Sequence, residues 1–291
     1  MLRTIDATLV NILGSVLGTN STLFYLAHDY WEEGTDDRSK QYPLVDISQA
    51  TISSIILLYG LLTYFIIPYF MKERKPFNLK GAIIGYDFLM VAINLFFFIK
   101  TIQLSDYGRE WFIWHDTTGD WSDRAMQYIW IAYLYYLSKL VDLFDTFFMA
   151  LRKSNQQITF LHIWHHSSLP YAGWLYLKYN PYTPSILIIP FVNSFVHIIM
   201  YGYYGMAALG PHMRPYLWWK KYITQIQLFQ FTIVFIWFVT IALARTNLPF
   251  GYLACSLFNA VVLFTLFSNF YIQSYRQQKK LNQIKQTEKI D

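Results

Sequence analysis

Charged residues and cysteine are scarce in this sequence. Of its 291 residues, 14% are Asp, Glu, Lys or Arg, whereas 55% are hydrophobic and 20% are aromatic. A soluble domain typically has about 25% charged residues, so the composition excludes that class and indicates a polytopic membrane protein. The single cysteine, Cys255, excludes a disulfide framework and a metal site built only from thiolates. The net charge of +5 is small and unevenly placed, which reflects membrane topology rather than nucleic-acid binding.

Glycine and proline are few within the apolar segments, which favours spanning helices over a barrel. Seven segments have the roughly 18–25 apolar residues that a helix needs to cross a membrane. They are expected at residues 49–70, 82–101, 127–150, 158–177, 183–208, 223–245 and 250–274. The sequence therefore predicts an all-α membrane protein with seven transmembrane helices.

No short repeat and no low-complexity linker divides the chain. We expect a single membrane domain over residues 1–275, followed by a basic tail over residues 276–291. Residues 7–18 are apolar but lack the basic flank and small-residue cleavage site of a signal peptide. They are expected to form an interfacial or short packing helix instead.

Basic and acidic loops alternate along the chain. Loops that should face one side carry, with the tail, 14 of the 23 basic residues, at 71–81, 151–157, 209–222 and 274–291. The loops of the opposite side are acidic, at 28–38 and between the second and third predicted spans. The positive-inside rule then predicts a lumenal or extracellular N-terminus and a cytosolic C-terminus. An odd number of spans agrees with that orientation.

Ionisable side chains recur in the predicted spans, where their burial usually marks function. In the third span, Lys139, Asp142 and Asp145 follow one another at three-residue steps and share a helix face. A buried ion-pair network that only joins helices is the simpler alternative. In the fourth span, HIWHH places His162 and His166 one turn apart, with His165 on the adjoining flank.

The next two spans carry polar stripes at the same depth. The fifth has Asn193, His197, Met200, Tyr201 and Tyr204, and the sixth has Thr224, Gln227 and Gln230. Glutamine alone often only bridges helices. However, all four groups fall in the half of the bundle near the basic loops, and the opposite halves are apolar and aromatic. This distribution predicts a polar chamber open to the cytosol and an apolar pocket reaching toward the lumen, which suits a molecule with a polar head and a hydrocarbon tail.

The chemistry of the histidines has two interpretations. Only four of the seven histidines reach the chamber, too few for a histidine-rich di-iron centre, although a mononuclear zinc site is chemically possible. Alternatively, a neutral imidazole is the nucleophile or general base, since its reference pKa lies near neutrality. Asp142 or Asp145 would then fix a tautomer, and Lys139, Asn193 and the glutamine amides would stabilise an oxyanion. Cys255 is expected in the lumenal half of the last span, at the wrong depth for the nucleophile.

Four motifs together resemble the ELO family of very long chain fatty acid elongases, which are membrane 3-ketoacyl-CoA synthases of the endoplasmic reticulum. The motifs are KLVDLFDT at 139–146, HIWHH at 162–166, NSFVHIIMYGYY at 193–204 and TQIQLFQF at 224–231. The resemblance implies six helices closed around a tunnel, and an acyltransferase that condenses long-chain acyl-CoA with malonyl-CoA to give 3-oxoacyl-CoA, CO2 and CoA. It implies no cofactor and no metal. Ketoreductase, dehydratase and enoyl reductase partners would process the product.

The resemblance also implies roles for the site residues. The acyl group would be carried on His165, and the other catalytic residues would be His162, His166, His197, Lys139, Asp142 and Asp145. Substrate-binding roles would fall to Asn193, Met200, Tyr201, Tyr204, Thr224, Gln227 and Gln230. The family usually has Glu where this chain has the shorter Asp142. Two of the motifs look somewhat closer to elongases of polyunsaturated chains.

Two other classes of protein fit part of the pattern. A seven-helix receptor has the same orientation, and a metal-dependent membrane lipid hydrolase or oxygenase would use the histidines as ligands. His, Lys and Asp converge at one cytosolic depth, which a receptor does not need and which favours an enzyme.

Overall fold

The computed structural model describes residues 1–244 and 248–287, with side chains described as far as Ser274 outside that gap. This described part is helical and has no strand. The long helices are α4 (Gln49–Leu61), η3 (Leu62–Ile66) and α5 (Ile67–Met71) in one rod, then α6 (Lys80–Leu104), α7 (Asp123–Val141), α8 (Phe144–Leu151), α9 (Phe160–Tyr179), η6 (Pro184–Leu187) with α10 (Ile188–Leu209), α11 (Lys220–Leu243) and α12 (Phe250–Thr287). The predicted tail continues α12 to Thr287, and residues 288–291 lie outside the described part.

Short helical pieces form the N-terminus and the loops. The N-terminal pieces are α1 (Leu2–Leu17), α2 (Thr22–Phe24), η1 (Tyr25–Asp29), α3 (Tyr30–Glu32) and η2 (Asp37–Ser39). The loops hold η4 (Arg109–Phe112), η5 (Asn155–Gln157) and η7 (Pro211–Tyr216). The helix expected over residues 7–18 is confirmed as α1. Asp6 docks it to the start of α4, because one carboxylate oxygen accepts hydrogen bonds from the hydroxyls of Ser48 and Thr51, at 2.6 Å each.

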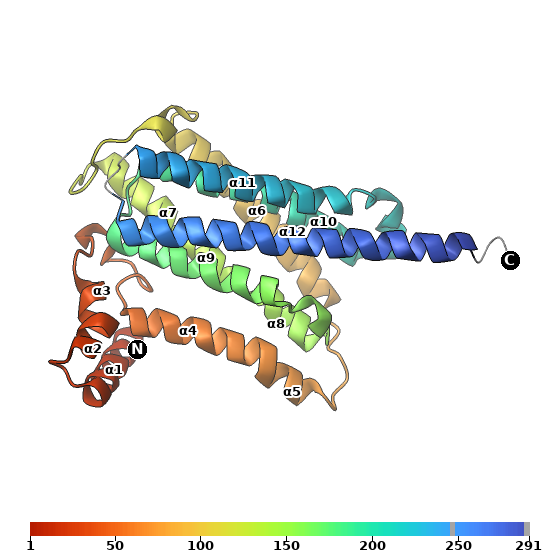
Figure 1. Cartoon of the computed structure of the whole chain (residues 1–291), viewed down its shortest axis with the longest axis horizontal. Coiled ribbons are helices and arrows are strands. Elements are labelled where there is room, and N and C mark those ends of the chain that lie inside the picture. The colour runs from red at the N-terminus through yellow and green to blue at the C-terminus, as the bar shows by residue number, and fades with distance from the viewer. Residues whose placement is uncertain (245–247, 288–291) are drawn as a thin grey trace.

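The rods alternate in direction along the chain (Figure 1). One end of the bundle carries the connections at residues 72–79, 152–159 and 210–219, and we call it the basic end. The other end carries the N-terminal segment and the connection at 105–122, and we call it the acidic end. The loops that were predicted to share a side therefore do share an end.

Five helices are long and apolar enough to cross a membrane, within the described residues: Gln49–Met71, Lys80–Leu104, Pro184–Leu209, Lys220–Leu243 and Phe250–Ser274. The other two predicted spans form α7 with α8, and α9, which lie alongside them (Figure 1). The polar residues of α7, α8 and α9 lower the mean hydropathy by which spanning helices are recognised. Residues 127–150 do not form the single helix that was expected, because the chain is interrupted at Asp142 and Leu143.

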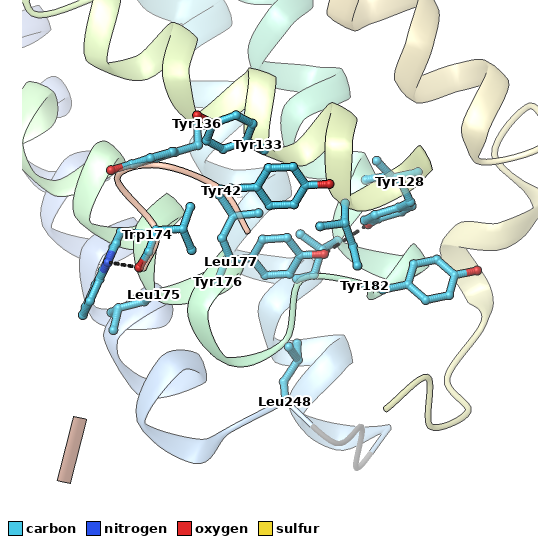
Figure 2. Packing of buried hydrophobic residues seen from close by; sticks show 14 of the residues in the cluster. Tyr42, Tyr128, Tyr133, Tyr136, Trp174, Leu175, Tyr176, Leu177, Tyr182 and Leu248 are labelled. Atoms are coloured by element: carbon cyan, nitrogen blue, oxygen red, sulfur yellow. Dashed lines mark hydrogen bonds between the residues drawn. The ribbon is translucent and has the colours of Figure 1, made fainter. Parts of the chain in front are cut away.

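An aromatic core fills the acidic end of the bundle. Figure 2 shows Tyr42 beside Tyr133, with the rings stacked at 4.7 Å between centroids. Trp174 of α9 donates from its indole nitrogen to the Val45 carbonyl at 3.1 Å, and the ammonium of Lys178 lies over the Trp174 ring. Residues 36–47, which we call the strap, thus pack against the sides of α7 and α9.

Buried cations hold the strap in place. Arg38 pairs with Asp36 at 2.6 Å and donates to the carbonyl of Thr117 at 3.1 Å, which ties the strap to the loop before α7. Lys178 donates to the Ile47 carbonyl and to Glu32, both at 2.8 Å. Each cation satisfies backbone carbonyls that would otherwise be buried without a donor.

Replacing Trp174 with alanine should destabilise the protein strongly. The side chain is 0% exposed, so Trp174→Ala leaves a large cavity and removes one of the two hydrogen bonds that the Val45 carbonyl accepts, the other coming from the Ile47 amide. We expect the free energy of unfolding to fall by about 3–5 kcal/mol, seen as a lower thermal midpoint in detergent. Trp218→Ala is the matched control, since Trp218 is 72% exposed, and it should leave the midpoint nearly unchanged. Equal midpoints for the two variants would contradict a packed acidic end.

Candidate active site

A buried ion pair lies where α7 gives way to α8. The Lys139 ammonium is 2.8 Å from the Asp142 carboxylate, and the two side chains are 4% and 5% exposed. Backbone hydrogen bonds tighten here to a three-residue spacing, from the amide of Leu143 to the Leu140 carbonyl and from that of Asp145 to Asp142. Tight turns of this kind inside a helix often accompany functional sites. Lys139 and Asp142, three residues apart, are neighbours on one face of this segment.

Tyr201 of α10 joins the two carboxylates of this segment. Its hydroxyl lies 2.7 Å from an oxygen of Asp145 and 3.3 Å from an oxygen of Asp142. His197, one turn earlier on α10, places Nδ1 3.9 Å from Asp142. The network therefore joins α7, α8 and α10, as either an active site or a structural ion-pair network would require.

Asn193 is oriented by two donors. Its Oδ1 accepts from the Tyr135 hydroxyl at 2.7 Å and from the Lys139 ammonium at 3.3 Å. An ammonium only donates, so the amide atom facing Lys139 must be the oxygen. The Asn193 NH2 group has no protein partner within the described residues and lies on the opposite side of the amide. It is thereby held as a hydrogen-bond donor for another molecule.

The three histidines of α9 have different surroundings. His162 is bonded through Nε2 to the Thr146 hydroxyl at 2.8 Å, and its ring lies 4.2 Å from that of His166. His165 instead lies between Phe231 and Phe267, at 6.3 and 6.1 Å between ring centroids. Nδ1 of His165 is buried without a hydrogen-bond partner within the described part of the chain. The imidazole of His162 is therefore held by a hydrogen bond to a side chain, whereas that of His165 is not.

A cavity of about 610 Å³ begins at this level and extends toward the acidic end. Four predicted site residues from four helices line its polar end, namely Lys139, His165, Asn193 and Gln230. The rest of its wall is mostly apolar and aromatic, for example Ala132, Tyr176, Leu187, Val234 and Leu263. Residues of the aromatic core line the end of the cavity that is farthest from Lys139 and His165. The predicted neighbourhood of a polar site and an apolar pocket is thus present.

The other predicted residues lie closer to the basic end along their helices, except His166, which follows His165 on α9 and is one position farther from that end. They are Asp142, Asp145, His162, His166, His197, Met200, Tyr201, Tyr204, Thr224 and Gln227. The Gln227 amide contacts the sulfur of Met200 at 3.5 Å. Tyr204 is partly exposed and meets the cluster only through the Tyr201 ring. Thr224 neither lines the cavity nor bonds to the cluster among the described residues.

Sequence reasoning missed four side chains at this site. Thr146 belongs to the KLVDLFDT motif and lies one turn after Asp142, and Tyr135 lies one turn before Lys139, so helical spacing could have found both. Asp87 of α6 is a buried carboxyl in a predicted span, with one oxygen unpartnered among the described residues. Tyr59 of α4 bonds to Thr146 at 2.6 Å, and its own span carries no charged residue that would have drawn attention to it.

No three His, Cys, Asp or Glu side chains of the described residues are grouped so that they could hold a metal ion. The rings of His162 and His166 pack against each other, and Nε2 of His162 is already hydrogen-bonded to the Thr146 hydroxyl. The protein is all-helical and membrane-spanning. The His165 imidazole, the Asn193 amide and the Lys139 ammonium meet at the polar end of a cavity whose wall is otherwise mostly apolar.

Comparison with known proteins agrees with this class. Residues 45–283 match the GNS1/SUR4 (ELO) family. The chain is 36% identical over 252 residues to very long chain fatty acid elongase 5 of Tachysurus fulvidraco, covering 86% of this chain and 83% of that protein. It is 38% identical over 256 residues to very long chain fatty acid elongase 1 of Mus musculus, covering 84% and 88%. The chain belongs to the ELO family, and the resemblance seen in its four motifs is confirmed.

Removing one partner of the buried ion pair should cost more than removing both. Lys139→Met leaves the Asp142 carboxylate buried without its cation, which should lower the free energy of unfolding by about 3–5 kcal/mol. In Lys139→Met/Asp142→Asn no charge is left unpaired, so the thermal midpoint should recover at least half of the loss. A double variant as unstable as the single one would show that packing, rather than charge pairing, holds this segment.

Proposed function

We propose that this chain is a 3-oxoacyl-CoA synthase, which condenses a long-chain acyl-CoA with malonyl-CoA to give 3-oxoacyl-CoA, CO2 and CoA. One observation carries the proposal: an untethered His165 stands at the polar end of an otherwise apolar cavity of about 610 Å³. A fatty acyl chain extends into such a cavity while its thioester remains at the polar end. The names of the relatives, very long chain fatty acid elongases, support the same substrate class.

The reaction proceeds through an acyl group on His165. A ring nitrogen attacks the thioester carbon, the C–S bond breaks, and the imidazole N–H proton goes to the CoA thiolate. Malonyl-CoA then loses CO2, and its enolate carbon attacks the acyl-imidazole carbon. The C–N bond breaks, and the released imidazole regains a proton from solvent. That proton is the one that the overall reaction consumes.

The residues around His165 stabilise the charges that develop. The oriented NH2 group of Asn193 donates to the oxyanion at the acyl carbon, which a preorganised donor stabilises without rearrangement. Lys139 supplies positive charge at the same end of the cavity, while Asp142 and Tyr201 hold that ammonium and its partner carboxylates in position. His166 and His197 have buried Nδ1 atoms without partners in the described residues, and they bind the malonyl unit through oxygens of its carboxylate or thioester.

The proposed setting is a seven-span arrangement in the endoplasmic reticulum, with six helices closed around a tunnel. The N-terminus is lumenal and the C-terminus cytosolic, so the polar cluster faces the CoA esters of the cytosol. Lys153, Arg214, Lys220 and Lys221 lie at the basic end, where CoA phosphates enter. The enzyme needs no cofactor, and a ketoreductase, a dehydratase and an enoyl reductase act on the product in turn.

Substitution of His165 should abolish condensation, whereas substitution of the single cysteine should not. His165→Ala removes the acyl carrier, and Cys255→Ser keeps the cavity wall at a position on α12 nearer the acidic end. In a host lacking its own elongases, we expect no 3-oxoacyl-CoA and no CO2 from His165→Ala, and at least about half of the wild-type rate from Cys255→Ser. The readouts are labelled CO2 from malonyl-CoA and mass spectrometry of the acyl-CoA products.

The same assay separates the other classes of protein. A wild-type chain that releases no CO2 with any acyl-CoA would favour a receptor. Stoichiometric metal in the purified protein, with activity lost to a chelator, would favour a metal-dependent hydrolase or oxygenase. An inactive Cys255→Ser variant would overturn the imidazole nucleophile. A panel of saturated and polyunsaturated acyl-CoAs tests the proposed preference for polyunsaturated chains.

Filling the cavity should shorten the chains that the enzyme accepts. Ala132 lines the cavity two turns before Lys139 on α7, about 10 Å deeper along the helix. Ala132→Trp should therefore lower kcat/KM for long acyl-CoAs at least about tenfold and spare shorter ones. Leu95→Trp, on the exposed face of α6, is the control and should leave the chain-length profile unchanged. A uniform loss over all chain lengths in Ala132→Trp would place the acyl chain elsewhere.

A further inference from the structure

A chain of hydroxyl groups runs from α4 through α8 to the histidine motif. The Tyr59 hydroxyl lies 2.6 Å from the Thr146 hydroxyl, which lies 2.8 Å from Nε2 of His162. Tyr59 is 4% exposed and Thr146 is 0% exposed. Three residues from three separate helical elements thus meet in a line that water does not reach at its centre. Nothing in the four sequence motifs would place Tyr59 there.

The direction of these hydrogen bonds follows from counting protons. Each hydroxyl has one proton, and Thr146 stands between two partners. If Thr146 donates to His162 Nε2, the Tyr59 proton goes to the Thr146 oxygen, and both buried protons have acceptors. In the opposite direction, His162 donates to Thr146 and Thr146 donates to Tyr59. The Tyr59 proton would then be buried without an acceptor among the described residues, which is unfavourable.

We infer that Tyr59 and Thr146 are positioning residues that hold His162 as the tautomer with its proton on Nδ1. With Nε2 occupied as an acceptor, His162 is kept from acting as the nucleophile and instead donates through Nδ1 to an oxygen of the incoming substrate. His165 has no such tether, because its Nδ1 is without a hydrogen-bond partner among the described residues. The inference rests on the proposed function, because it assigns different roles in the same reaction to His162 and His165.

The tether also positions a second ring. The imidazoles of His162 and His166 lie 4.2 Å apart between centroids, and His165 lies 5.5 Å from His166. A His162 ring that is fixed by Thr146 therefore fixes the face against which His166 packs. Loss of the Thr146 hydroxyl should change the orientation of the whole motif while leaving the acyl cavity intact, since neither Tyr59 nor Thr146 lines it.

The test compares two substitutions of Thr146, one that removes its hydroxyl and one that keeps it. Thr146→Val keeps the shape of the side chain without the hydroxyl, and Thr146→Ser keeps the hydroxyl. We expect Thr146→Val to lower kcat by about 10–100-fold, with KM for acyl-CoA within about twofold, and Thr146→Ser to stay within about threefold of wild type. Tyr59→Phe leaves the Thr146 proton free to turn away from His162, so its effect on kcat should be smaller, about 3–10-fold.

The double variant distinguishes a relay from two separate contacts. If Tyr59 acts only through Thr146, Tyr59→Phe should have no further effect on kcat once Thr146→Val is present. Multiplied effects, or a Thr146→Val enzyme with more than half of the wild-type kcat, would overturn the relay. So would a Thr146→Ser enzyme as slow as Thr146→Val.

Folding and the proposed function are checked separately. Thermal midpoints of all variants in detergent show whether a loss of kcat reflects a loss of structure. Should Thr146→Val fail to fold, the comparison of Tyr59→Phe with Thr146→Ser decides, because the relay requires that the first be slower than the second. A wild-type chain that forms no 3-oxoacyl-CoA contradicts the proposed function itself, whereas an active wild type with unaffected Tyr59 and Thr146 variants contradicts only the relay.

Discussion

The buried ion pair between Lys139 and Asp142 is the constraint around which the bundle is organised. Two charges in an apolar interior are tolerated only when they are paired and their remaining hydrogen-bonding capacity is met. Lys139 therefore also donates to Asn193, and Asp142 also accepts from Tyr201. These demands tie α7 to α10 at one depth, and they are met at the place where the helical pattern is interrupted between α7 and α8. The pair itself follows from the three-residue spacing, which makes Lys139 and Asp142 neighbours on one helix face.

The pair also divides the interior into two regions of opposite character. On its acidic-end side, the cavity wall is apolar and aromatic, and residues of the aromatic core line its far end. On its basic-end side, the carboxylates of Asp142 and Asp145 bond to Tyr201, whereas His166 and His197 keep Nδ1 atoms without partners in the described residues. A molecule that bridges the two regions needs a hydrocarbon portion and a polar reactive portion joined at the level of His165. An acyl thioester has that construction, and its reactive carbon is the atom at the junction.

Helical spacing was sufficient to predict which polar residues share a face, since Lys139, Asp142 and Asp145 lie on one side of a single segment. The charges of the loops added the direction of each helix and hence the depth of each motif. Together they were sufficient to predict that polar residues of four helices converge. It could not predict Tyr59, whose contact with Thr146 joins positions 87 residues apart without any local pattern. Nor could spacing predict the interruption at Asp142, because a helical pattern continues through it. Asp87 was visible as a carboxyl in an apolar span, but its setting against α10 depends on the close approach that Gly205 permits.

The histidine motif shows why residue type alone does not assign a mechanism. Three imidazoles within five positions are chemically equal in the sequence, and a metal site, a base or a nucleophile could be built from them. Their neighbours make them unequal: a hydroxyl is bonded to one nitrogen of His162, whereas His165 packs between two aromatic rings and its Nδ1 has no partner among the described residues. An imidazole that must attack a thioester needs an available lone pair, and one that must steady an oxygen needs a fixed proton. We propose that packing from α4, α8 and α11 meets these two conditions, the first at His165 and the second at His162.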